Sequence, residues 1–191
     1  MWLCVISDKI DLMKRRLPPD VTILLEQPTD IEGVRKVNQV AFGRDGEAQV
    51  VDRLRVNCPD ILSLVAKLGE QVLGHILFSM VTIVQDDGRK ITGMGLGPLA
   101  VLPAHQGQGI GSALCQEGLE RVAQRGYPFV IVLGHPGYYP RFGFTKASEF
   151  GITSTFAGVP DDAFMICVFD AGALQGVRGV AHYRSEFDEI S

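Results

Sequence analysis

The sequence of 191 residues lacks the features of a membrane-spanning or strongly basic protein. No apolar run approaches the about 18 residues that a membrane-spanning helix needs. The first residues hold only a short apolar stretch with the charges after it, an order opposite to that of a secretory signal. With 18 Lys and Arg against 22 Asp and Glu, the formal net charge is −4. We therefore expect a cytoplasmic protein that has neither nucleic acid nor a membrane as its main partner.

Cysteine is also scarce, with four residues in the whole chain: Cys4, Cys58, Cys115 and Cys167. Their spacings match no zinc or redox motif. We expect reduced, mostly buried thiols in a reducing compartment, and no bound metal.

The composition predicts one globular domain, because 46% of the residues are hydrophobic and 21% are charged. Residues 1–20 precede the first patterned strand and end near Pro18-Pro19. They are expected to be a dispensable N-terminal extension. Residues 21–191 are then the single folded domain.

Hydrophobic periodicity predicts alternating strands and helices along this domain. Strands are expected at 21–26, 61–68, 72–84, 90–103, 129–134, 163–169 and 179–184, and helices at 28–41, 47–57 and 109–124, with a helical turn near 138–142. Asp86-Asp87-Gly88 is typical of a hairpin turn. Pro98 and its neighbouring glycines predict a bulge or a sheet edge within 90–103. The order indicates an α/β fold with a mixed sheet.

The most informative segment is the glycine-rich turn Gln106-Gly107-Gln108-Gly109-Ile110-Gly111, which lies between a strand and a helix. Glycines let the backbone turn sharply and come close to a ligand. The open N–H groups and the dipole of a helix start make an anion site suited to a pyrophosphate. Ser112 could add a hydroxyl donor.

Other glycine motifs fit this turn poorly. If the first glycine of a dinucleotide-binding fingerprint is set on Gly107, Ser112 stands where the third glycine should be. The preceding strands also read as antiparallel. A P-loop is excluded because no Gly-Lys-Ser/Thr follows. A plain glycine-containing loop remains the simplest alternative.

The pattern Gln106-x-x-Gly109-x-Gly111 resembles the [Gln/Arg]-x-x-Gly-x-[Gly/Ala] motif of the GNAT N-acetyltransferases, and Leu99-Ala100-Val101-x-Pro103 resembles the strand before it. The longer strings GLGPLAVLPAHQGQGIGSAL and VLGHPGYYPRFGF are similar to the bacterial YhbS-like branch. The resemblance covers about residues 21–185 and is strongest in the centre. It implies a mixed, mainly antiparallel central sheet of about six to seven strands flanked by helices.

The resemblance implies acetyl-CoA as the acyl donor and no metal. Backbone N–H groups of residues 107–112 would hold the coenzyme pyrophosphate, and the strand at 99–101 would pair with the pantetheine arm. One amide there would polarise the thioester carbonyl. The implied coenzyme-binding residues are Leu99, Ala100, Val101, Gln106, Gly107, Gln108, Gly109, Ile110, Gly111 and Ser112.

A second segment, Gly134 to Phe144, resembles the aromatic-Tyr-x-x-x-Gly-Phe stretch of the same family. It implies that Tyr139 is the general acid that protonates the departing CoA thiolate. A phenol with a pKa of about 10 can do this when proton transfer is concerted with departure. Packing of Tyr138 and Tyr139 against the sheet is the alternative. Many relatives carry an asparagine upstream of this tyrosine, where this chain has Gly134-His135-Pro136.

An amine acceptor with a pKa of about 10.4 is mostly protonated at pH 7, and removing that proton costs about 4–5 kcal/mol. The candidates for a base are Glu47, then His75, then His135. Simpler interpretations exist for Glu47, for His75 and for the unranked His105. Glu47 could be a charge at a helix start, His75 a hydrogen-bonded core residue, and His105, beside the glycine turn, a solvated loop residue.

These observations predict an N-acetyltransferase that moves the acetyl group of acetyl-CoA to a primary amine of a small molecule or peptide, by direct attack in a ternary complex. Two alternatives stay open. One is a non-catalytic acetyl-CoA sensor or scaffold, and the other is acyl transfer to a hydroxyl or from a longer acyl donor. A homodimer is compatible with the sequence. The sequence does not identify the acceptor.

Overall fold

The computed structural model describes residues 17–190. Cys4 and most of the predicted N-terminal extension lie outside this range. Leu17, within the segment predicted to be dispensable, packs against the main core cluster. None of the helices in the described part of the chain is long and apolar enough to cross a membrane. Cys58, Cys115 and Cys167 are buried, unpaired thiols, as the sequence predicted for these three.

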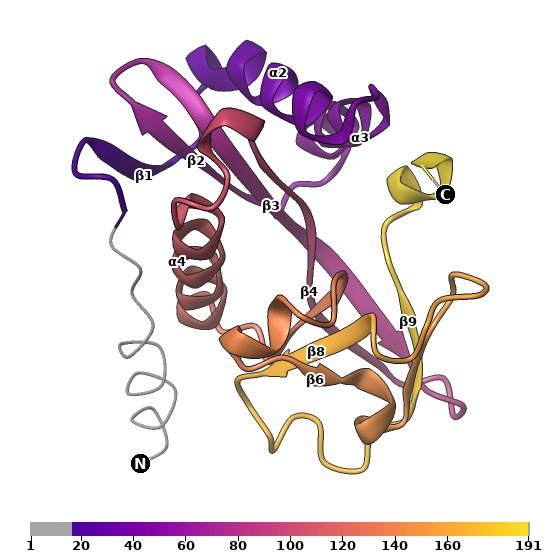
Figure 1. Cartoon of the computed structure of the whole chain (residues 1–191). Coiled ribbons are helices and arrows are strands. Elements are labelled where there is room, and N and C mark those ends of the chain that lie inside the picture. Colours follow the sequence, from indigo (N-terminus) through magenta and orange to yellow (C-terminus); the bar gives the residue numbers. More distant parts are fainter. Residues whose placement is uncertain (1–16, 191) are drawn as a thin grey trace.

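One mixed sheet forms the centre of the molecule (Figure 1). Its main path runs β1-β2-β3-β4-β5-β8-β6, and β9 joins it by pairing with both β3 and β7. The bounds are Val21–Leu25 for β1, Leu62–Leu68 for β2, Gln71–Val84 for β3, Lys90–Val101 for β4, Phe129–Leu133 for β5, Thr145–Lys146 for β6, Ile152–Ser154 for β7, Phe164–Val168 for β8 and Gly179–His182 for β9. Only β4–β5 and β7–β9 are parallel. The predicted fold class is confirmed.

Helices cover both faces of the upper part of this sheet (Figure 1). Helix α4 (Ile110–Gln124) packs on one face, and α2 (Ile31–Phe42) and α3 (Gly46–Asn57) pack on the other. Successive residues of β2 alternate between these two layers: Leu64 lies in the cluster under α4, and Val65 lies in the cluster under α2 and α3.

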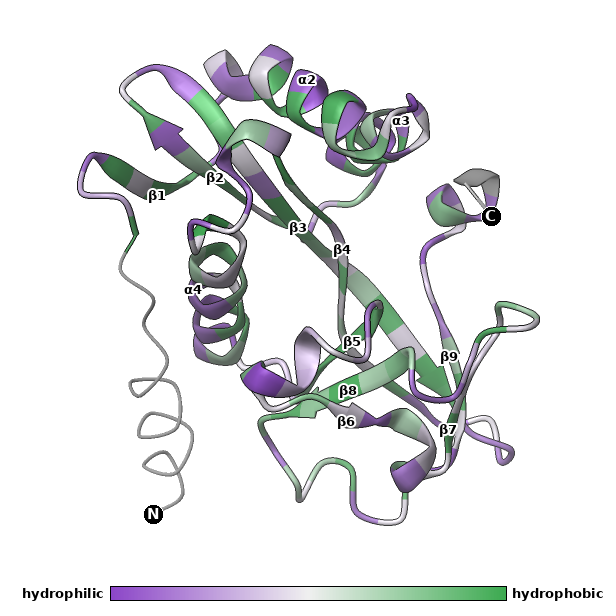
Figure 2. Cartoon of the chain, in the orientation of Figure 1, coloured by the Kyte–Doolittle hydropathy of each residue, from purple (hydrophilic) through white to green (hydrophobic). Residues whose placement is uncertain are grey.

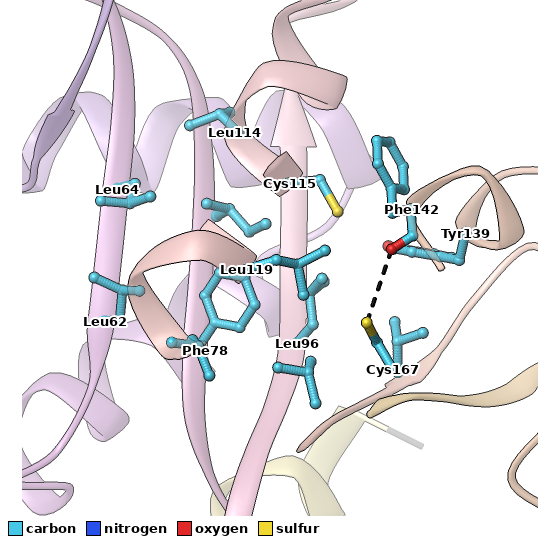
Figure 3. Close-up of a cluster of buried hydrophobic side chains, with 14 of the residues drawn as sticks. Leu62, Leu64, Phe78, Leu96, Leu114, Cys115, Leu119, Tyr139, Phe142 and Cys167 are labelled. Carbon is cyan, nitrogen blue, oxygen red and sulfur yellow. Dashed lines mark hydrogen bonds between the residues drawn. The ribbon is translucent and has the colours of Figure 1, made fainter. Parts of the chain in front are cut away.

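The α4 layer is closely packed. Its hydrophobic residues face the strands, and its hydrophilic residues face away (Figure 2). Gly118 lets the ring of Phe78 reach the helix backbone, since an added Cβ would lie 2.3 Å from that ring. Tyr139 and Phe142 close the same cluster at its edge (Figure 3). Helix α4 is therefore held firmly against the sheet, which fixes the position of its first turn.

Strand β4 changes partners in a way that opens the sheet. Leu96 pairs with Phe78, and Leu99 pairs with Ile76. Gly97 and Pro98 therefore lie together opposite Leu77 and form the bulge that the sequence suggested. On its other edge, β4 pairs with β5 only from Met94 to Leu96. Beyond Leu96 that edge carries no β5 partner, and two cavities lie there.

Candidate active site

The first cavity, of about 460 Å³, lies between the end of β4 and the start of α4. We call it the loop cavity. It is lined by Leu99, Val101, His105, Gln106, Gly107, Gly109, Ile110, Gly111, Ser112, His135, Tyr138, Tyr139 and Arg141. The glycine turn and the tyrosine segment, which the sequence singled out separately, therefore face one space.

The glycine turn leaves the start of α4 open to a ligand. Gly107 and Gly109 have φ values of 75° and 88°, which L side chains rarely adopt. No side chain caps the first turn of α4. Gln106 donates to the carbonyl of Val101 at 3.0 Å, and Gln108 donates to that of Ala104 at 3.2 Å, so both side chains brace the loop. The open backbone N–H groups are suited to a pyrophosphate.

Arg141 is the one lysine or arginine among the residues that line the loop cavity, and the sequence analysis did not select it. Its guanidinium lies 4.5 Å from the centre of the Tyr138 ring. It also donates hydrogen bonds to the carbonyls of Tyr138 at 2.8 Å and Gly137 at 3.3 Å. This arrangement brings a fixed positive charge to the predicted phosphate site.

Tyr138 belongs to the loop cavity. Its hydroxyl is hydrogen-bonded to that of Ser112, and burial is the main cause that raises its pKa. An added Cβ on Gly111 would lie 3.1 Å from the same hydroxyl. Tyr138 thus reaches the first turn of α4, on the phosphate side.

Tyr139 lies deeper, at the edge of the core. Its ring makes edge-on contacts with Tyr138 at 5.1 Å and Phe144 at 5.5 Å. It also covers Gly134, where an added Cβ would lie 2.2 Å from the ring. Burial raises the pKa of Tyr139 well above its usual range, and the phenol is therefore protonated at neutral pH, as a proton donor must be. The packing predicted as the alternative is therefore present, and the role of Tyr139 as a proton donor stays a prediction.

A second cavity, of about 610 Å³, is also lined by Tyr139. We call it the apolar cavity, after most of its lining. It is lined by Phe42, Glu47, Val50, Leu96, Gly97, Pro98, Leu99, Leu133, Gly134, His135, Tyr139, Phe156, Ala157, Val159, Tyr183 and Phe187. Leu99, His135 and Tyr139 line both cavities. The two spaces therefore adjoin at the open edge of β4.

Glu47 lies in the first turn of α3 and lines the apolar cavity, with 5% of its surface exposed. Arg44 Nη2 donates to Glu47 Oε1 at 2.6 Å, and Arg44 Nε donates to both carboxylate oxygens at 3.1 Å. Glu47 is therefore a charge at a helix start, as its simpler interpretation predicted, and also a carboxylate at a cavity. Its role as a base stays a prediction. His135, the third candidate base, is exposed and lines both cavities.

His75, the second candidate base, lies elsewhere. It is fully buried and lines neither cavity. Its Nδ1 is 3.1 Å from Asn38 Nδ2, and its Nε2 is 3.0 Å from Ser63 Oγ. Burial, with the charge of Arg55, lowers its pKa to about 3. We therefore correct this assignment: His75 is a hydrogen-bonded core residue without access to an acceptor.

Two of the predicted coenzyme-binding residues do not line the loop cavity. Ala100 is buried toward α2 and α3, because alternation along β4 turns Leu99 and Val101 to the cavity instead. Gln108 is exposed and braces the loop. Within residues 17–190, no group of three or more His, Cys, Asp or Glu residues could hold a metal ion.

Comparisons with known proteins give one consistent result. The acetyltransferase (GNAT) family matches residues 32–144. The uncharacterized N-acetyltransferase YhbS of Escherichia coli strain K12 is 35% identical over 169 residues, which span 88% of this chain and 99% of that protein. The crystal structure of E. coli YhbS in complex with CoA matches with a TM-score of 0.82 at 32% identity, over 92% of this chain and 97% of the other. A GNAT family acetyltransferase from Brucella melitensis, in complex with acetyl-CoA, matches with a TM-score of 0.71 at 36% identity, over 88% and 98%.

Proposed function

Because the chain belongs to the GNAT family of acetyltransferases, which use acetyl-CoA, we propose that it acetylates a primary amine of a small molecule or peptide. The amine attacks the thioester directly in a ternary complex. The observation that carries this proposal is the pair of adjoining cavities, which have Leu99, His135 and Tyr139 in common. Donor and acceptor can then be held at the same time, on either side of Tyr139.

The loop cavity suits the donor. The uncapped N–H groups at the start of α4 and the guanidinium of Arg141 suit the pyrophosphate. Leu99 and Val101 belong to the edge of β4 that has lost its β5 partner, so this edge is available to the amide-containing pantetheine arm. An N–H on the same edge would polarise the thioester carbonyl and stabilise the negative charge of the tetrahedral intermediate.

Tyr139 would protonate the thiolate as it leaves. Its raised pKa keeps the proton on the phenol until negative charge develops on sulfur. Its place between the cavities puts it beside the point where donor and acceptor meet. The sulfur then leaves as a neutral thiol, which does not reverse the reaction by attacking the new amide.

Glu47 would act on the acceptor side. The amine must lose a proton before or as it attacks, and a carboxylate in the same cavity can accept that proton directly or through water. His135 is the alternative acceptor of the proton because it lines both cavities. A sensor that only binds acetyl-CoA has no need of a second cavity containing a buried carboxylate.

An acceptor screen tests the proposal. Acetyl-CoA is mixed with primary amines and with the corresponding alcohols, and both thiol release and the acetylated product are followed. We expect acetylated amines and initial-rate plots that intersect, as for a ternary complex. Thiol release with no amine would support the sensor, ester products would support transfer to a hydroxyl, and parallel plots would support an acetylated enzyme.

Glu47→Gln tests the acceptor side separately. It should lower kcat/KM for the amine and leave the Kd of acetyl-CoA unchanged. Glu32→Gln is the matched control, because Glu32 is an exposed residue of α2 outside both cavities. An unchanged kcat/KM in Glu47→Gln would move the role to His135 or to water.

A further inference from the structure

Three aromatic residues form one side of the apolar cavity: Phe156, Tyr183 and Phe187. The rings of Phe156 and Tyr183 are 5.7 Å apart, and those of Tyr183 and Phe187 are 5.5 Å apart. We call these three residues the aromatic wall. They come from the loop after β7, the residue after β9 and the last helical turn η5 (Ser185–Ile190).

The wall is held rigidly against β4 and α3. An added Cβ on Gly95 would lie 2.6 Å from the Tyr183 ring, and one on Gly97 would lie 3.7 Å from the Phe187 ring, so the rings rest on glycine backbone. Arg53 of α3 donates to the carbonyl of Glu186 at 3.2 Å, which fastens η5 beside Phe187. A rigid aromatic face of this kind stacks well on a planar ring.

The rest of the lining is mostly aliphatic, and its one carboxylate is Glu47. The partners in the Arg44–Glu47 pair differ sharply in exposure: 59% of the Arg44 side chain is exposed, against 7% of the Glu47 side chain. The guanidinium can therefore regain its hydration on leaving, so the cost of separating the pair falls on the buried carboxylate. The carboxylate cannot follow, and without Arg44 it requires another cation.

We propose that the acceptor is an arylalkylamine, a primary amine carried on a short chain with an aromatic ring at its other end. The ring lies against the aromatic wall, and the ammonium takes the place of Arg44 at Glu47. The cavity, of about 610 Å³, has room for such a molecule. This inference rests on the proposed function and names the substrate class of the same site.

The same geometry disfavours other acceptors. The second ammonium of a diamine such as putrescine would be buried against apolar side chains without a partner. An arylalkyl alcohol fits the wall but cannot replace the Arg44 charge at Glu47. Both compounds are therefore matched probes, one for the wall and one for the carboxylate.

Equilibrium binding tests the inference without turnover. We measure binding of 2-phenylethylamine, putrescine and 2-phenylethanol to the CoA-loaded chain by calorimetry. We expect 2-phenylethylamine to bind at least about tenfold more tightly than either of the others. Equal affinities, or tighter binding of putrescine, would overturn the proposal.

Variants of the aromatic wall test where the ring of 2-phenylethylamine binds. Phe156→Ala and the milder Phe156→Leu should each weaken 2-phenylethylamine binding, by about tenfold for the alanine, without changing CoA affinity. Phe169→Ala is the matched control, because Phe169 is partly buried but lines neither cavity. If Phe156→Leu folds and binds the amine as the wild type does, the ring does not lie at the wall.

Arg44→Gln tests the exchange of cations. It removes the competing guanidinium and should tighten 2-phenylethylamine binding several-fold, whereas Glu47→Gln should abolish the preference for the amine over the alcohol. Weaker amine binding in Arg44→Gln would contradict the exchange. Tight binding without acetylation would refute the proposed function but support the inferred ligand class, and faster acetylation of putrescine would do the opposite.

Discussion

At the scale of the single residue, Tyr139 is the side chain on which the chemical account depends. Tyr139→Phe should lower kcat by about 10²–10⁴-fold and leave the Kd of acetyl-CoA nearly unchanged. The reason is that the phenol is needed only when charge develops on sulfur, whereas the bound thioester is neutral.

Tyr127→Phe is the control for this substitution, because the Tyr127 hydroxyl bonds to Asp60 and the residue lines neither cavity. Single-turnover measurements expose the chemical step even when product release is slow. A loss of only a few-fold in that step would assign the proton to another group. One alternative is Tyr183, a buried tyrosine that also lines the apolar cavity.

His75 makes a different prediction, about stability. Its pKa is about 3 in the folded chain and about 6.5 when unfolded, so the unfolded chain binds the extra proton below pH 6.5. The stability from neutral His75 is therefore complete above pH 6.5 and is lost as the pH falls toward 3. Glu26, 3.9 Å away, favours the charged ring, but Arg55 pairs with Glu26 at 2.6 Å and opposes this.

Urea unfolding at pH 7 and pH 5 measures this effect. The free energy of unfolding should fall by about 2 kcal/mol more in the wild type than in His75→Gln, which has no titrating ring. His182→Gln replaces an exposed histidine and should behave as the wild type. Equal losses in wild type and His75→Gln would mean that protonated His75 is accommodated in the fold.

At the scale of the element, the start of α4 is the predicted phosphate site. Ser112→Asp should abolish the thermal stabilisation by acetyl-CoA, because its carboxylate repels the pyrophosphate. The fold should tolerate the change, since acidic residues stabilise a helix start and Asp can still accept a hydrogen bond from Tyr138. Gln124→Glu makes the same change of charge at the other end of α4.

That control should retain the wild-type shift in melting temperature with acetyl-CoA. A stable Ser112→Asp chain with an undiminished shift would show that the coenzyme phosphates bind elsewhere.

The elements around the loop cavity could be predicted from the sequence because their signals are local. The glycine turn and the bulge at Pro98 are each indicated by a few neighbouring residues, and the periodicity of α4 lies within one helix. His75 was misjudged because β3 is buried on both faces, and the sequence alternation cannot tell which buried residues reach a cavity. The short strands β6 and β7 offered too few residues for a pattern.

At the scale of the whole molecule, the two cavities differ in how the chain builds them. The loop cavity comes from two segments, 99–112 and 135–141. The apolar cavity combines residues 42–50, 96–99, 133–139, 156–159 and 183–187. Its aromatic wall depends on β9 pairing with β3, a contact between distant parts of the chain. Most of the loop cavity could therefore be predicted from the sequence, and most of the apolar cavity could not.

The most direct test of the account uses a conjugate that fills both cavities at once. In it, the sulfur of CoA is joined through an acetyl bridge to the nitrogen of 2-phenylethylamine, and its Kd is compared with that of CoA. We expect binding at least about 100-fold tighter than that of CoA, because the second contact becomes intramolecular. Phe156→Ala should remove most of this gain. A conjugate that binds no more tightly than CoA would contradict the claim that donor and acceptor meet beside Tyr139.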